Sequence, residues 1–189
     1  GEKIAVYYAY GSIVDSETIN LLEGGGHCIV GKSTAEDLRK LADDDDVKAV
    51  VFRVNSGGGS AVASEQIRHA IKLLKEKKPV VVSMGGMAAS GGYWISSPAN
   101  YIFAEPTTIT GSIGIFGLIP NFSGLVTDKL GVTFDGVTTN KFTDYENDLI
   151  LGKDPNEIMQ HMQTYINQGY QNFLDIVSEG RGIKPAMVD

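Results

Sequence analysis

A serine that could act as a nucleophile lies in a segment built almost entirely of small residues. Ser90 belongs to residues 85–92 (GGMAASGG), where alanine and glycine flank it on both sides. Small neighbours leave its hydroxyl uncrowded, and a helix expected to start just after it would favour developing negative charge. A serine at a helix start is more commonly an N-cap, whose hydroxyl bonds to the backbone. The group that could remove its proton therefore decides what Ser90 does.

A second glycine-rich segment, residues 55–60 (NSGGGS), stands in the same context as the first. Each segment follows an apolar run, 47–54 or 80–84, and each precedes a helical pattern. In an α/β sheet, ligands bind where strands deliver loops at their C-terminal ends, and unpaired helix N–H groups can hold an anion there. One such segment alone is most simply a tight turn, but two on neighbouring strands favour a binding site.

The proton acceptor for Ser90 is not evident among the three histidines. His69 falls within an expected helix, His161 lies on the last helical segment, and His27 lies in a loop. The remaining base at neutral pH is a lysine whose pKa is lowered by desolvation, since its free amine could take the serine proton. The residues alone do not identify that lysine.

Residues 26–33 (GHCIVGKS) satisfy the pattern of a phosphate-binding P-loop letter for letter. That site also needs a buried strand running directly into the loop, whereas the preceding residues are 20–25 (NLLEGG). The next strong apolar run along the chain ends at an asparagine, not at a magnesium-binding aspartate. We therefore interpret residues 26–33 as a glycine-rich loop leading into a helix, with Ser33 and Glu36 as its capping box.

The apolar pattern of the chain alternates between the periods of strands and helices. Short runs rich in β-branched residues at 4–9, 47–54 and 80–84 are typical of buried parallel strands. Apolar residues at spacings of three and four predict amphipathic helices over 61–76 and 155–178. This alternation implies right-handed βαβ units and an α/β layer fold. Shorter strands are expected at residues 101–104, 114–117 and 132–137.

The composition is that of one globular domain and limits the partners of the chain. The 189 residues are 42% hydrophobic and 21% charged, which is enough apolar surface for one core. A net charge of −7 argues against nucleic acid as a partner, because phosphate binding relies on clustered lysine and arginine. The single cysteine, Cys28, excludes an internal disulfide and gives no metal-ligand spacing. A serine nucleophile that acts with a lysine base needs no metal or other cofactor, so none is expected. Without an apolar stretch of about 18 residues, the chain itself is expected to be soluble.

Three segments give the chain a resemblance to a known family. They are residues 48–60 (KAVVFRVNSGGGS), 78–100 (KPVVVSMGGMAASGGYWISSPAN) and 110–117 (TGSIGIFG). The chain resembles the C-terminal domain of the long form of signal peptide peptidase A, or protease IV, a membrane-anchored bacterial serine peptidase. The resemblance implies a single peptidase domain over residues 1–189, with the repeated βαβ units of the Clp protease and crotonase fold. It also implies that the chain is a fragment of a longer protein.

The resemblance further implies roles for individual residues. Ser90 matches the family's nucleophile, and the N–H groups of Gly59 and Gly91 match its oxyanion hole. Lys141, in residues 137–144 (VTTNKFTD), matches the lysine base of short-form members and would complete a Ser-Lys dyad. Long-form members take that base from the N-terminal domain, and short-form dyads form across a subunit boundary. Lys141 and a lysine from another domain are therefore kept as alternatives for the base.

The function implied by the resemblance is cleavage of signal peptides left in the membrane, by a serine endopeptidase that forms an acyl-enzyme. Its expected partners are peptide substrates, the N-terminal domain of the same protein and neighbouring subunits of a homo-oligomeric ring. The expected location is the extracytoplasmic side of the bacterial cell membrane. Two alternatives are a crotonase-like acyl-CoA enzyme, which has no use for Ser90, and a domain that only assembles rings. Gly57 replaces the family's usual proline, which loosens the first glycine-rich turn.

Overall fold

The chain divides into two compact units. The computed structural model describes residues 1–17, 26–140, 143–144, 147–148 and 155–189. The first unit comprises Gly1–Gly114 and Asn172–Asp189, and the second unit comprises Ile115–Gln171. Ser90, Gly59 and Gly91 all lie in the first unit. The expectation that residues 1–189 form one peptidase domain stays a prediction.

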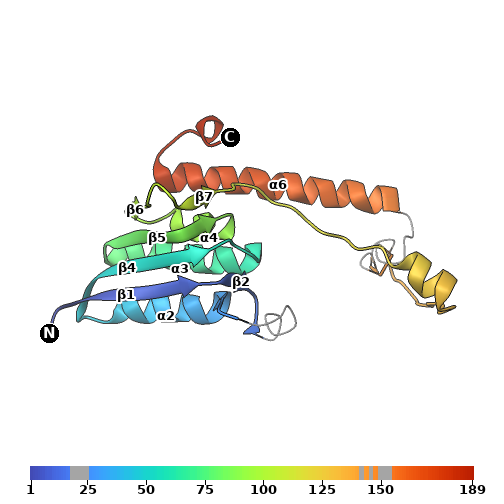
Figure 1. The fold of residues 1–189 in the computed structure, drawn as a ribbon, viewed down its shortest axis with the longest axis horizontal. Coiled ribbons are helices and arrows are strands. Elements are labelled where there is room, and N and C mark those ends of the chain that lie inside the picture. The colour runs from blue at the N-terminus through green and yellow to red at the C-terminus, as the bar shows by residue number, and fades with distance from the viewer. Residues whose placement is uncertain (18–25, 141–142, 145–146, 149–154) are drawn as a thin grey trace. The chain divides into compact units, whose positions relative to one another are not determined.

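The first unit is built on a parallel sheet of five strands (Figure 1). β1 (Lys3–Tyr10), β4 (Val47–Ser56), β5 (Val80–Ala89) and β6 (Tyr101–Phe103) are neighbours in that order, and β7 (Ile109–Gly111) pairs with the end of β5. Every pairing is parallel, so the C-terminal ends of the strands meet at one edge. The α/β class predicted from the alternating pattern is confirmed.

Three helices pack against one face of this sheet (Figure 1). α2 (Gly31–Asp43) and α3 (Ala61–Lys77) lie side by side, and α4 (Gly91–Ser96) follows β5 directly. The core between sheet and helices consists of alternate strand residues, such as the fully buried Phe52 and Val82, and of the apolar stripe of α3. The strand period of two and the helix period near 3.6 are the patterns from which these elements were predicted.

The opposite face of the sheet carries exposed apolar side chains. On β1, Tyr8 is 75% exposed, and on β6 Tyr101 and Phe103 are 68% and 63% exposed. These side chains alternate with more buried ones along their strands, so they share one face. Parallel sheets are generally buried on both faces, which makes this surface unusual. We call it the open face, and it comprises Ile4, Val6, Tyr8, Tyr10, Tyr101 and Phe103.

Several predicted strands differ from the structure. β5 continues to Ala89, so residues 85–89 are strand and not the loop that their glycines predicted. Residues 114–117 and 132–137 form no strand, and the described part of the second unit, to which all of them but Gly114 belong, contains no strand with which they could pair. A short strand that was not predicted, β7, pairs instead with the end of β5, and it begins a few residues before the first of these segments. Strands at 4–9, 47–54 and 101–104 are confirmed.

The start of α2 also differs from its prediction. β2 (Ser12–Val14) pairs with β3 (Cys28–Val30), and the chain runs from β3 directly into the helix at Gly31. The N-cap residue is therefore Val30, which offers no side-chain cap, and the hydroxyl of Ser33 donates to its carbonyl oxygen at 3.4 Å. The predicted capping box of Ser33 and Glu36 is wrong, because both residues already lie inside the helix.

The second unit contains a π-helix, η1 (Gly124–Lys129), and the first part of α6 (Pro155–Arg181). α6 confirms the helix predicted over residues 155–178, and its last part belongs to the first unit. Apolar side chains of the second unit are unusually exposed, among them Phe116 and Leu118 at 87% each and Val137 at 100%. None of the helices in the described ranges is both long and apolar enough to cross a bilayer.

Candidate active site

β5 carries a bulge just before Ser90. Val54 of β4 pairs with Met84 of β5, and Ser56 pairs with Ala88. Between these two pairs β4 has the single residue Asn55, whereas β5 has the three residues 85–87. The Asn55 side chain fills this β5 bulge, and its Oδ1 accepts the N–H of Met87 at 3.0 Å. Only glycine fits opposite it, because a Cβ at Gly85 would lie 2.8 Å from Asn55 Oδ1. The asparagine therefore gives the glycine-rich segment a strand conformation.

Two threonines of the β7 segment hold the other side of β5. Thr108 Oγ1 donates to the carbonyl oxygen of Gly85 at 2.8 Å. Thr110 Oγ1 makes a bond of the same length to the carbonyl oxygen of Ala88. The N–H of Ser90 itself donates to the last carbonyl of β7 at 2.9 Å. Hydrogen bonds therefore fix β5 as far as Ser90.

The backbone of Ser90 adopts a conformation that glycine normally occupies. Its φ of 51° and ψ of −120° are the mirror image of the first central position of a type II turn. Ser90 is the N-cap residue of α4, and its carbonyl oxygen accepts the N–H groups of Tyr93 and Trp94, each at 2.9 Å. Its side chain makes no cap hydrogen bond. The hydroxyl is thus not used to cap the helix, which argues against the N-cap interpretation.

The two glycine-rich segments touch at Ser90. A Cβ at Gly58 would lie 2.5 Å from the Gly91 nitrogen and 3.1 Å from the Ser90 Cβ. A Cβ at Gly91 would in turn lie 3.2 Å from the Gly59 nitrogen. Gly58 also has a φ of +96°, which residues with a Cβ rarely adopt. Glycine is needed for this close approach, which brings the predicted residues Ser90, Gly59 and Gly91 together.

The N–H groups of Gly59 and Gly91 are available to a ligand. Within the described part of the chain, neither N–H group has a hydrogen-bond acceptor. Gly59 forms a parallel bridge with Ile13, but the bonds of that bridge use the carbonyl oxygen of Gly58 and the N–H of Ser60. Gly91 is the first residue of α4, where a helix leaves its N–H groups unpaired. Two free donors beside a serine hydroxyl are what an oxyanion hole requires.

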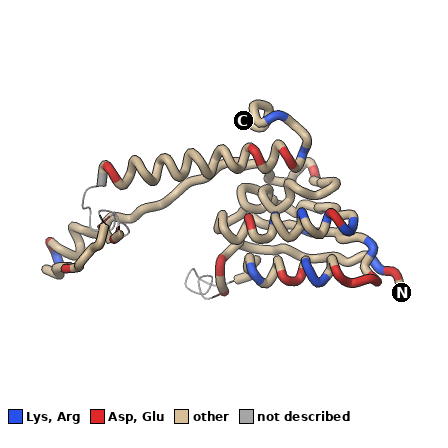
Figure 2. Tube along the Cα trace, turned by 180° about the vertical axis from the view of Figure 1, so that it is seen from behind, with Lys and Arg blue, Asp and Glu red and all other residues tan. Residues whose placement is uncertain are grey.

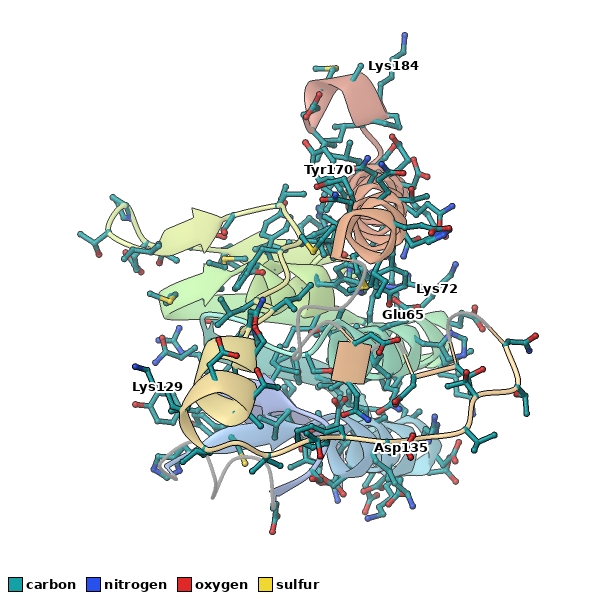
Figure 3. All side chains as sticks on the ribbon, turned by 90° about the vertical axis from the view of Figure 1, so that its right-hand side faces the viewer. Glu65, Lys72, Lys129, Asp135, Tyr170 and Lys184 are labelled. Carbon is teal, nitrogen blue, oxygen red and sulfur yellow. The ribbon has the colours of Figure 1, made fainter. Side chains whose placement is uncertain are left out.

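The buried side chain of Trp94 anchors α4 to α3. Trp94 Nε1 donates to Glu65 Oε2 at 2.9 Å, and Arg68 donates to both oxygens of the same carboxylate at 2.8 Å. Burial alone would raise the pKa of Glu65, but the bonds from Arg68 and Trp94 outweigh it and hold the pKa below its ordinary value. The Trp94 ring also packs on Phe173 of α6, with 4.5 Å between ring centroids. Figure 3 shows Glu65 and Lys72 extending from α3. The start of α4, with its free N–H, is fixed by these contacts.

The structure describes the three histidines that were considered as proton acceptors, but not the lysine. Lys141 lies outside the described residues. His69 is within α3, His161 is within α6, and His27 precedes β3, where its ring packs on that of Tyr10 with 5.1 Å between centroids. No group of three or more His, Cys, Asp or Glu residues that could hold a metal ion occurs in the described ranges. The described residues thus include a candidate nucleophile and two candidate oxyanion donors, but no candidate base beside them is shown.

The P-loop pattern at residues 26–33 does not have P-loop geometry. Its middle residues form β3, and its last three residues already belong to α2. A phosphate cradle needs the residues between its glycines to form a loop with inward-pointing N–H groups. The expected glycine-rich loop is wrong for Cys28–Val30, which are strand, and the nucleotide alternative has no support.

Comparison with known families identifies the family to which the chain belongs. The sequence model of peptidase family S49 matches residues 72–189, which include Ser90 and the strand before it. The chain belongs to peptidase family S49. The sequence model of Clp protease matches residues 2–108 of this S49 chain, as the expected fold requires. The resemblance to signal peptide peptidase A and the Clp-type fold are confirmed at the level of the family.

Relatives match this S49 chain over most of its length. Protease 4 of Haemophilus influenzae is 50% identical over 188 residues, which are 99% of this chain and 29% of that protein. Protease 4 of Salmonella typhi is 46% identical over 100% of this chain and 29% of that protein. The chloroplastic serine protease SPPA of Arabidopsis thaliana is 36% identical over 76% of this chain and 21% of that protein. A solved ClpP1 mutant from Listeria monocytogenes, 14% identical, covers 97% of this chain and 75% of its own with a TM-score of 0.48. The chain therefore spans less than a third of the length of these curated relatives.

Three residues of the S49 site were not singled out from the sequence: Asn55, Thr108 and Ser112. Asn55 and Thr108 bond to the β5 bulge, and Ser112 has a φ of 49° directly after β7. Ser90 and Ser112 are the two non-glycine residues with positive φ in the described part of the chain. Asn55 and Ser112 lie in the segments that carry the resemblance, but side-chain bonds to a distant backbone have no periodic signal in sequence.

Proposed function

We propose that the protein containing this chain is a serine endopeptidase that forms an acyl-enzyme at Ser90. Membership of family S49 supports this activity, and so does the name of the plant relative, which is a serine protease. One observation carries the proposal for the site. Ser90, whose hydroxyl is unused as a helix cap, stands where the two glycine-rich segments touch, and the N–H groups of Gly59 and Gly91 in these segments are unpaired. Acyl transfer requires that combination of nucleophile and oxyanion donors.

The proposed reaction begins with attack of the Ser90 Oγ on the carbonyl carbon of the scissile peptide bond. A lysine amine takes the serine proton as the bond forms. Negative charge develops on the carbonyl oxygen, and the N–H groups of Gly59 and Gly91 stabilise it by on the order of 3 kcal/mol each. Collapse of the tetrahedral intermediate breaks the C–N bond, and the protonated lysine gives its proton to the leaving amine. Water then hydrolyses the ester through the same donors.

The lysine in this proposal comes from another domain of the same protein. A lysine works as a base only where burial lowers its pKa, because a solvated ammonium supplies almost no free amine at neutral pH. Lys141 stands in a segment, residues 138–148 (TTNKFTDYEND), that is polar in sequence. Such a segment would keep the lysine protonated unless another domain covers it. The division of labour resembles that of the long-form enzymes, in which nucleophile and base come from different domains.

We expect the isolated 189-residue chain to be nearly inactive, although Ser90 is present. A serine hydroxyl is a weak nucleophile until a nearby base removes its proton. The full-length protein should hydrolyse a chromogenic peptide ester or amide, and full-length Lys141→Ala should hydrolyse it at a similar rate. Full activity of the isolated chain that is lost on Lys141→Ala would show that Lys141 is the base and that this division is wrong.

The proposed substrates are signal peptides left in the membrane after their cleavage from secreted proteins. The proposed location is the extracytoplasmic side of the bacterial cell membrane, and both proposals rest on the resemblance to signal peptide peptidase A. A homo-oligomeric ring is also proposed. The exposed apolar side chains of the second unit, such as Phe116 and Leu118, support assembly because surfaces of that kind mark contacts between subunits. A domain that only assembles rings would share this feature without needing a free hydroxyl at Ser90.

Covalent trapping tests the proposed activity directly. A crotonase-like acyl-CoA enzyme would use the same oxyanion donors without a serine nucleophile. We expect a fluorophosphonate to modify Ser90 in the full-length protein. Hydrolysis of a synthetic signal peptide should fall in proportion to the fraction of protein that is modified. Peptide mass spectrometry locates the adduct. A full-length protein that hydrolyses the peptide and carries no adduct at Ser90, even after prolonged treatment, would overturn the proposal.

A further inference from the structure

The β5 bulge (residues 85–87) is bonded in a way that the reaction does not yet explain. Met87 pairs with Ile109 of β7, and two side chains bond to further polar backbone groups of the bulge. Asn55 Oδ1 accepts the N–H of Met87 at 3.0 Å on one side, and Thr108 Oγ1 donates to the carbonyl oxygen of Gly85 at 2.8 Å on the other. Both bonds lie within five residues of Ser90. The bulge is therefore bracketed by one side chain from β4 and one from the segment before β7.

The two bracketing side chains are themselves held in place. The Thr108 hydroxyl accepts the N–H of Glu105 at 3.1 Å, and the Thr108 N–H donates back to the Glu105 carbonyl oxygen at 2.9 Å. The Asn55 carbonyl oxygen accepts the N–H of Gly11 at 3.0 Å, just after β1. The side chain of Asn55 also lies so close to Gly85 that a Cβ there would be 3.0 Å from its Cγ. The Thr108 hydroxyl is thus held by a second hydrogen bond, and the backbone of Asn55 is bonded to the residue after β1.

Asn55 connects the two halves of the site. It belongs to β4, the strand that leads to Gly59, and its side chain bonds to β5, the strand that leads to Ser90. A bulge sets how far along the sheet the rest of its strand extends, and a slip of one residue reverses which face each side chain points to. The bracketed bulge therefore determines where the Ser90 hydroxyl stands relative to the Gly59 N–H.

We propose that Asn55 and Thr108 are positioning residues, which hold the β5 bulge in register and so align Ser90 with the oxyanion donors. The inference rests on the proposed function, because alignment matters only if Ser90 attacks a carbonyl group. Neither residue needs to touch the substrate. A misplacement of about 1 Å in a reacting group can lower turnover by about a hundredfold, so small shifts of the bulge should be visible in kcat.

The test uses side-chain pairs of matched shape in the full-length protein. Thr108→Val removes the hydroxyl and keeps the volume, Thr108→Ser keeps the hydroxyl, and Asn55→Leu removes the acceptor. We expect Thr108→Val and Asn55→Leu each to lower kcat by about 10- to 100-fold with little change in KM. Thr108→Ser should stay close to the wild type. The double variant should lose less than the product of the two single losses, since both side chains hold the same bulge.

Thr34→Val is the control for a general loss of stability. Thr34 is a buried threonine of α2, so this change also removes a buried threonine hydroxyl and keeps the volume. It should lower the unfolding temperature and leave kcat unchanged. Circular dichroism and thermal unfolding of every variant separate folding from alignment. Should Asn55→Leu fail to fold, the Thr108 pair decides by itself.

The experiment distinguishes failure of the positioning role from failure of the proposed function. If wild-type protein hydrolyses the peptide and is labelled at Ser90, but Thr108→Val and Thr108→Ser have equal kcat values, the positioning role is wrong. The same holds if Thr108→Val behaves like Thr34→Val, with lowered stability and unchanged kcat. If the wild type is never labelled at Ser90 while it hydrolyses the peptide, the proposed function itself fails before any variant is compared.

Discussion

Replacing Ser90 by glycine should abolish peptide hydrolysis and stabilise the fold at the same time. Loss of the hydroxyl removes the nucleophile, and we expect turnover of the full-length protein to fall by more than about a thousandfold. The gain in stability has a separate cause. At a φ of 51° and a ψ of −120°, a side chain is strained, and glycine relieves that strain. After the larger backbone entropy of unfolded glycine is subtracted, a net gain of about 1 kcal/mol in the free energy of unfolding is expected.

Ser90→Ala is the matched control for this substitution, because alanine removes the hydroxyl but keeps the strained Cβ. It should be as inactive as Ser90→Gly and no more stable than the wild type. Peptide hydrolysis and urea-induced unfolding of the three proteins make the comparison. Residual turnover above about a tenth of the wild-type rate in either variant would exclude Ser90 as the nucleophile. Equal stabilities of the glycine and alanine variants would show that the Ser90 backbone is not strained.

Gly58→Ala should lower turnover by about 100-fold or more, even though residue 58 supplies no catalytic group. The new Cβ would lie 2.5 Å from the Gly91 nitrogen, and the φ of +96° disfavours any side chain at this position. To relieve the contact, the two glycine-rich segments must separate, and the Gly59 and Gly91 N–H groups can then no longer reach the same oxyanion. Loss of one such donor alone typically costs a factor of about 100 to 1,000 in kcat.

Gly57→Ala provides the neighbouring control for Gly58→Ala. A Cβ at Gly57 would meet the Met87 sulfur at 3.0 Å, and the end of that flexible side chain can move. Gly57 also has no positive φ. We expect near-wild-type turnover for Gly57→Ala and a slow reaction of Ser90 with fluorophosphonate for Gly58→Ala. Normal turnover of a folded Gly58→Ala protein would show that close approach of the segments is not required.

The repetitive parts of the fold could be predicted from the sequence, because they repeat a local pattern. β4 and α3 match their apolar periods to within a few residues. The extension of β5 over residues 85–89 could not be predicted, since its strand conformation depends on Asn55 and Thr108, each more than 20 positions away from the group that it bonds. Residues 132–137 have the composition of a strand, but the described part of the second unit contains no strand with which they could pair.

The sequence was sufficient to predict which residues lie together at the candidate site. It did not explain why a particular residue type is needed at each position. Ser90, Gly59 and Gly91 were expected together, and the contacts of Gly58 now explain why that segment needs glycine. Sequence alone could not separate a nucleophile from an N-cap, because both uses place a serine before a helix. The absence of a cap hydrogen bond at Ser90 argues against the N-cap use, and its role as a nucleophile stays a prediction. Lys141, outside the described residues, stays a prediction.

The open face gives the first unit the character of an amphiphile. Lysine, arginine, aspartate and glutamate gather on the helices of one side (Figure 2), whereas Tyr8, Tyr101 and Phe103 face the solvent on the other. Copies of a chain with a net charge of −7 repel one another in dilute buffer, and about 1 M salt shortens the range of that repulsion to roughly 3 Å. Apolar attraction does not weaken in the same way. We therefore expect the isolated chain to stay dispersed at low ionic strength and to self-associate as salt is added.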